Sequence, residues 1–153
     1  MKPPLSHSLE TGLDYAAARQ LAAHPEVAIR RELAANQSVP AEILYFLAED
    51  ADPSVRMAVA ANIACPAKGN LLLADDADPA VRAALAGKVG SLALPRKGGV
   101  AAAVLDQLTR DRIAAVRAII AEALKDVADA DPALIRRLAR DAEIIVAAPV
   151  LEC

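Results

Sequence analysis

The stretch AEDADPSVR at residues 48–56 recurs as ADDADPAVR at residues 74–82, an offset of 26 residues. The same offset relates the flanking apolar positions and extends back to a copy that contains Leu21. Further copies follow after 35 and 30 residues, at Leu108 and Leu138. Five copies in register predict a repeat protein, because a unit this short cannot bury its apolar face alone and must stack on its neighbours.

Each copy contains two short segments with apolar residues at helical spacing, and no window alternates over enough residues to predict a sheet. Asp-Pro pairs at 52–53, 78–79 and 131–132 mark helix starts, since the carboxylate accepts free amides and proline has no amide to leave unpaired. The predicted helices cover residues 13–23, 26–35, 40–49, 53–64, 67–74, 79–88, 100–110, 112–126 and 132–140, with a last helix from about residue 142.

The pattern therefore predicts an all-α fold, a right-handed α-solenoid of about five two-helix repeats. The whole chain, residues 1–153, forms one repeat domain in this prediction. Its repeats cover residues 13–38, 39–64, 65–90, 100–129 and 130–153.

Composition agrees with closely packed helices. Of 153 residues, 56% are hydrophobic, 24% charged and 2% aromatic, and 38 are alanine. This apolar fraction excludes intrinsic disorder. The net charge of −3 argues against a general nucleic-acid binder. We expect a cytoplasmic protein without membrane association, because no apolar run reaches the ~18 residues of a membrane span, the N-terminus lacks a secretory apolar stretch, and Cys65 and Cys153 form no disulfide framework.

An acidic residue and an arginine six positions later recur between the two helices of a repeat. The pairs are Asp50–Arg56, Asp76–Arg82 and Asp111–Arg117, and His24–Arg30 has the same spacing. Stacked repeats would align these residues into a ladder, in which each arginine bridges its own or the neighbouring acidic turn. We predict a structural role for the ladder; the alternative is a row of arginines that binds a substrate.

Other recurring polar residues also favour a structural interpretation. Asn36 and Asn62 occur where second helices end, and we expect them to close these helices in the left-handed conformation. In the third copy Lys88 takes this position, after Gly87. Cys65, which precedes a proline, is expected to be a small core residue.

The glycine-rich segment 87–99 interrupts the repeat, because the offset to the next copy is nine residues longer than the offset of 26 before it. We predict a loop over this whole segment. A plain surface insertion is the first interpretation. The second is a loop that contacts a partner through Arg96 and Lys97, because insertions in solenoids gather on one face and often carry recognition.

The repeated pattern Leu-Ala-x-Asp-x-x-x-x-Val-Arg-x-x-(Leu/Val)-Ala, best seen at 47–60 and 73–86, resembles HEAT-like repeats and the bacterial leucine-rich-repeat-variant group. Residues 141–151 resemble the end of the repeat region in a bacterial family of uncharacterised HEAT-like domains. This resemblance implies a binding scaffold, usually for protein, and no common reaction. The iron–sulfur cluster that some proteins of the variant group carry needs cysteines that this sequence lacks.

The residues support no catalytic, cofactor-binding or metal-binding site. The two histidines form no metal-binding pair, and Cys65 has no second cysteine at ligand spacing. We expect a non-enzymatic protein-interaction scaffold that uses the face made by successive second helices, with Arg31, Met57 and Ala61 toward solvent.

The alternative is a HEAT-like DNA-binding protein or DNA glycosylase for alkylated purines. That function requires a basic groove with aromatic residues that stack a base, and an acidic catalytic residue. Tyr15, Tyr45 and Phe46 instead fall in the first helices. A bilin-lyase-like activity, known among other HEAT-like proteins, is a third and weaker option.

The end of the sequence is strongly apolar. Residues 143–151 read EIIVAAPVL, and Ala147 stands where the ladder arginine belongs. A solenoid needs a polar outer face on its last repeat. We therefore expect residues 144–151 to be covered, either by a second copy in a homodimer or by a further C-terminal domain.

Overall fold

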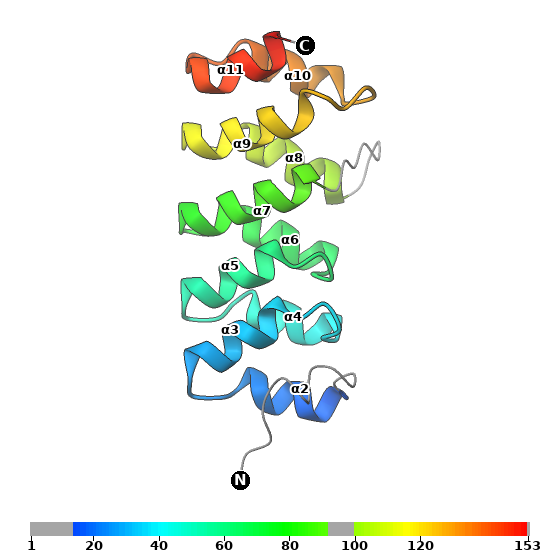
Figure 1. The fold of residues 1–153 in the computed structure, drawn as a ribbon, viewed down its shortest axis with the longest axis vertical. Coiled ribbons are helices and arrows are strands. Elements are labelled where there is room, and N and C mark those ends of the chain that lie inside the picture. Colours follow the sequence, from blue (N-terminus) through cyan, green and yellow to red (C-terminus); the bar gives the residue numbers. More distant parts are fainter. Residues whose placement is uncertain (1–13, 92–99, 153) are drawn as a thin grey trace.

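The computed structural model describes residues 14–91 and 100–152. In these segments the chain forms ten α-helices stacked in sequence order along one long axis (Figure 1). The helices alternate between two layers, and each helix packs against the next helix of its own layer. The all-α class and the arrangement as a helical repeat, both predicted from the sequence, are confirmed.

One layer contains the first helix of each repeat and the other contains the second. The first helices are α2 (Tyr15–Ala22), α4 (Ala41–Leu47), α6 (Ala67–Ala74), α8 (Val100–Thr109) and α10 (Pro132–Ala139). The second helices are α3 (Val27–Ala35), α5 (Pro53–Ala61), α7 (Pro79–Ser91), α9 (Ala114–Leu124) and α11 (Ile144–Leu151).

Aspartate and proline start the helices where the sequence predicts. The Asp52 carboxylate accepts from the amide of Ser54 at 2.8 Å at the start of α5. Asp131 accepts from Ala133 at 2.9 Å at the start of α10. Each cap satisfies an amide that has no partner within the helix, and the proline that follows has no amide to satisfy.

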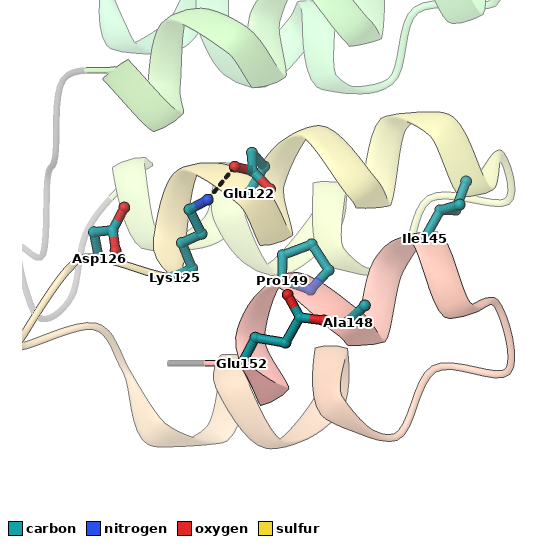
Figure 2. A pocket seen from close by; sticks show the side chains of 7 residues that line it. All are labelled: Glu122, Lys125, Asp126, Ile145, Ala148, Pro149 and Glu152. Atoms are coloured by element: carbon teal, nitrogen blue, oxygen red, sulfur yellow. Dashed lines mark hydrogen bonds and ion pairs between the residues drawn. The ribbon is translucent and has the colours of Figure 1, made fainter.

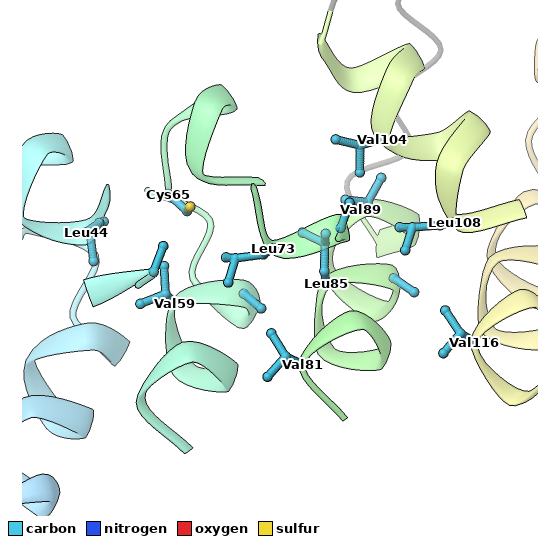
Figure 3. Packing of buried hydrophobic residues seen from close by; sticks show 14 of the residues in the cluster. Leu44, Val59, Cys65, Leu73, Val81, Leu85, Val89, Val104, Leu108 and Val116 are labelled. Carbon is cyan, nitrogen blue, oxygen red and sulfur yellow. The ribbon is translucent and has the colours of Figure 1, made fainter. Parts of the chain in front are cut away.

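A single apolar core runs between the layers (Figure 3). Leucine from the first helices and β-branched residues or leucine from the second helices meet there, at the same register in every repeat. The fully buried members include Leu47, Leu73, Leu108 and Leu138 from the first layer and Leu33, Val59, Leu85 and Ile120 from the second.

Two helix ends differ from the prediction by three residues, whereas the other predicted boundaries agree within two. Helix α7 continues to Ser91, so the loop expected from Gly87 is wrong for residues 87–91. The helical spacing of Val81, Leu85 and Val89 explains the extension, because all three are buried on one face of α7. Gly87 faces open space and interrupts nothing. Helix α5 ends at Ala61, whereas the pattern predicted helix to residue 64.

Candidate functional site

The predicted ladder residues are brought together between neighbouring repeats. Each arginine holds the aspartate of the next repeat, with Nε donating to one carboxylate oxygen and Nη2 to the other. The Nε–Oδ2 distances are 2.8 Å for Arg30–Asp50, 2.8 Å for Arg56–Asp76, 2.6 Å for Arg82–Asp111 and 2.7 Å for Arg117–Asp141. Asp141, which the sequence argument left out of the ladder, completes it.

Each arginine also binds its own turn. Arg56 Nη1 donates to the carbonyl of Asp50 at 2.7 Å, and Arg82 Nη1 donates to the carbonyl of Asp76 at 2.7 Å. The hydrogen bond to the next aspartate raises the pKa of Arg56, while that from Arg117 lowers the pKa of Asp141. Because both members of each pair are bound within the fold, the geometry supports a structural ladder rather than a row of substrate-binding arginines.

A second line of contacts joins the opposite ends of the second helices. Asn62 Nδ2 donates to the carbonyls of Ala34 at 2.8 Å and Asn36 at 2.9 Å in the preceding repeat. The expected left-handed conformation is wrong: Asn36 and Asn62 have φ of −83° and −80°. Their side chains instead accept the amide two residues ahead, which an extended backbone permits.

Lys88 continues this line in the third repeat. Its Nζ donates to the Asn62 carbonyl at 3.1 Å and also to Asn70 Oδ1. The side chain is buried, and burial lowers the pKa of Lys88. Cys65 is buried in the core as predicted, and burial raises the pKa of its thiol.

Beside the ladder, the surface of the central second helices is uncharged up to Glu122 of α9. Its members are exposed or half-buried positions of α5, α7 and α9 between the ladder and Glu122, and we call them the neutral surface. They are Ser54, Met57, Ala58, Ala61, Ala80, Ala83, Ala84, Gly87, Ala115, Ala118 and Ile119. Arg31, also expected to face solvent, is exposed on α3 at the edge of this surface, with Nη1 3.4 Å from Ser54 Oγ.

Large apolar side chains are exposed on the first helices, a feature that sequence reasoning missed. Tyr45 is 40% exposed and Phe46 59% on α4, while Leu71 is 40% and Leu72 38% on α6. The signal was present in the repeat register, because Phe46 and Leu72 each stand one position before a core leucine. When a helix buries only one face, a residue directly before a core leucine points away from the core and toward solvent.

A groove lies between the last two second helices (Figure 2). Ile145, Ala148 and Pro149 of α11 form its apolar part. The polar lining consists of Glu122, Lys125, Asp126 and Glu152, of which Lys125 pairs with Glu122. Helix α11 exposes Ile144 at 77%, Ile145 at 55% and Leu151 at 63%. The apolar end expected from the sequence is therefore only partly folded inward, through the buried Val146 and Ala147.

Chemical sites are sparse in the described residues. Within 14–91 and 100–152, no group of three or more His, Cys, Asp or Glu side chains is placed to hold a metal ion. No helix of these segments is long and apolar enough to cross a membrane. Arg96 and Lys97, considered above as partner contacts, lie outside the described residues.

Comparison with known proteins finds no match to this chain. No family model matches this sequence, and neither a curated protein nor a solved structure matches it. The resemblance to HEAT-like repeats therefore depends on the repeated sequence pattern and on the stacked helix pairs alone.

Proposed function

We propose that this chain is a non-enzymatic protein-binding scaffold of the HEAT-like type, which contacts its partner through the neutral surface of α5, α7 and α9. The observation that carries this proposal is that eleven of the twelve aligned surface positions of α5, α7 and α9 are uncharged, with Glu122 as the exception, in a chain that is 24% charged. Interface cores are depleted of charged residues in the same way, because each charge would lose its hydration on binding.

The small side chains of the neutral surface favour association for two further reasons. Alanine and glycine have no side-chain rotamers to lose when a partner binds, so ordering the surface costs little entropy. A layer of such residues also lets the partner's backbone or large side chains come close to the helices. Met57, 37% exposed, is the largest flexible side chain of this surface and can adapt to a partner's shape.

The same features weigh against the nucleic-acid alternative. Duplex binding needs several Lys or Arg contacts to phosphates, and the neutral surface supplies none. Stacking of a flipped base needs aromatic side chains beside that basic groove. Tyr15, Tyr45 and Phe46 lie on α2 and α4, in the other helix layer.

The test is a comparison of surface variants in affinity capture from the native cell. Ala61→Arg and Ala115→Arg introduce charge at exposed positions of the neutral surface, and arginine preserves helix propensity. Ala41→Arg and Ala133→Arg make the same change at exposed positions of the first helices. We expect partners bound by the unmodified protein to be lost from the first pair and kept by the second. Equal recovery with all four variants would contradict the proposal.

A further inference from the structure

The groove between α9 and α11 combines an apolar floor with a negatively charged rim (Figure 2). Its lining contains three carboxylates, those of Glu122, Asp126 and Glu152, and one ammonium group, that of Lys125. Since Lys125 pairs with Glu122, the rim keeps a net negative charge. The floor is accessible, because Ile145 is 55% exposed.

Pro149 lies inside α11 and contributes apolar surface to this groove. Pro149 has no amide, and its ring stands beside the Ile145 carbonyl, where a regular helix would place the amide donor. Residues four apart lie on the same helix face, and both Ile145 and Pro149 line the groove. The Pro149 ring and the Ile145 side chain therefore form one continuous apolar part of the groove.

We propose that this groove binds a cationic amphipathic segment of the partner protein, one that presents arginine or lysine beside apolar side chains. The inference rests on the proposed scaffold function and names the chemistry of one part of the partner. An arginine side chain suits the site because its methylene stem can cover Ile145 and Ala148 while its guanidinium group donates to the acceptors at the rim.

The position of the groove supports the same partner. Glu122 marks the end of the neutral surface, at the register that Ala61 and Gly87 occupy in earlier repeats. A partner that lies along α5, α7 and α9 would reach α11 next, with its basic segment over the carboxylates.

A second copy of this chain fits the groove less well. Symmetric contact of two grooves would place Glu122, Asp126 and Glu152 of one copy near the same carboxylates of the other. Like charges brought together in an interface repel each other and weaken association. Charge complementarity therefore favours a basic segment over a homodimer, which is one of the two coverings expected from the apolar sequence of residues 144–151.

The test uses two fluorescein-labelled synthetic helices and the full chain. Both helices carry leucine on one face; the first has arginine on the other face and the second has glutamate. Fluorescence anisotropy should show saturable binding of the arginine helix that weakens with salt, and no saturable binding of the glutamate helix.

Charge-matched variants locate the binding. The double change Asp126→Lys with Glu152→Lys should weaken binding of the arginine helix by at least about tenfold, because each reversed charge replaces attraction by repulsion. Glu42→Lys with Glu49→Lys makes the same net change at exposed positions near α4 and should leave the affinity within about twofold. Ile145→Gln should also weaken binding, whereas Leu72→Gln on α6 should not.

Three results would overturn the inference: equal binding to both charge-reversed proteins, equal binding of the two helices, or self-association in sedimentation that Ile145→Gln abolishes and that blocks the arginine helix. Failure here is distinguishable from failure of the scaffold function. If Ala61→Arg and Ala115→Arg still lose captured partners while the arginine helix does not bind the groove, the scaffold function stands and the groove assignment is wrong.

Discussion

An arginine in the first turn of each ladder-bearing second helix contacts two repeats at once. In Arg56, Nη1 binds the carbonyl of Asp50 in its own repeat, while Nε and Nη2 bind the carboxylate of Asp76 in the next. Only a guanidinium group offers donors in this fixed planar arrangement; lysine has a single flexible ammonium group. The ladder therefore depends on residue type as well as on charge.

Removing one ladder arginine should destabilise the protein measurably. We expect Arg56→Ala to lower the free energy of unfolding by about 1–3 kcal/mol, because it leaves the mostly buried carboxylate of Asp76 without its partner. Arg56→Lys should recover only part of the loss. Urea-induced unfolding followed by circular dichroism measures both.

The matched control is an arginine in an exposed pair. Arg110 lies 3.4 Å from Asp106, and their side chains are 61% and 48% exposed. Arg110→Ala should change the free energy of unfolding by less than about 0.5 kcal/mol, since exposed pairs contribute little. Equal losses for Arg56→Ala and Arg110→Ala would contradict the ladder's structural role.

Burial of Lys88 predicts a pH dependence. Its pKa in the fold is below the ordinary value of 10.5, so below that folded pKa the protein bears the full cost of a buried charge. As pH rises from the folded pKa toward 10.5, the folded state loses its proton before the unfolded state, and stability increases. Cys65 acts in the opposite direction, because its pKa is raised above 9.0.

Measurement in a Cys65→Ala background removes the opposing thiol. In that protein the free energy of unfolding should rise as the solution is made more alkaline, up to about pH 10.5. Lys88→Asn should abolish the rise, because an amide side chain has no proton to lose in this pH range. An unchanged rise after Lys88→Asn would show that another group causes it.

At the scale of the helix, α6 contains a glycine that packing requires. A Cβ atom at Gly69 would lie 2.7 Å from Cys65 Sγ, closer than these atoms can approach. Both residues are buried, so the sulfur has little room to move away. The glycine weakens α6 intrinsically but allows Cys65 into the core.

This contact predicts a coupling between two substitutions. Gly69→Ala alone should not stabilise the protein, although alanine favours a helix over glycine by roughly 1 kcal/mol. In the Cys65→Ala protein the same change should raise the free energy of unfolding by about 0.5–1 kcal/mol. A double-mutant cycle measured by denaturant unfolding gives the coupling energy. If the double mutant's change in unfolding free energy equals the sum of the two single changes, the contact is unimportant.

Across the whole molecule, the ladder spans a change in repeat length. Arg82 and Asp111 are separated by 29 residues, whereas the two pairs before them are separated by 20. Nevertheless, the Nε–Oδ2 distance of this pair, 2.6 Å, is the shortest of the four ladder pairs. Its two side chains are each 6% exposed, less than those of the other pairs. The stacking of α9 on α7 therefore keeps the ladder continuous past the inserted segment.

Stacking in one dimension predicts that damage remains local. Arg82→Ala should speed amide hydrogen exchange most in α7 and α9, the helices joined by its pair, because each repeat contacts only its neighbours. Arg30→Ala should instead affect α3 and its neighbours and leave α11 unchanged. Exchange that increases equally in all helices after either change would mean that the whole chain opens as one unit.

The regular spacing of the sequence repeats predicted most of the helices in this fold. The offset between residues 48–56 and 74–82 predicted the helix pairs, and the Asp-Pro dipeptides predicted three helix starts. The end of α7 was mispredicted because glycine at 87 suggested a loop, whereas burial of Val89 keeps the helix going. Local propensity competes there with tertiary packing, and packing prevails.

The sequence by itself determined the helices, their order and the residue types of the ladder, because these depend on spacing and capping within one repeat. Only the tertiary structure decided that each arginine pairs with the aspartate of the next repeat, that Lys88 donates to the Asn62 carbonyl, and that Ile145 and Glu122 meet at one groove. These contacts depend on how far one helix pair is displaced and rotated against the next, and that displacement results from the packing of side chains distant in sequence.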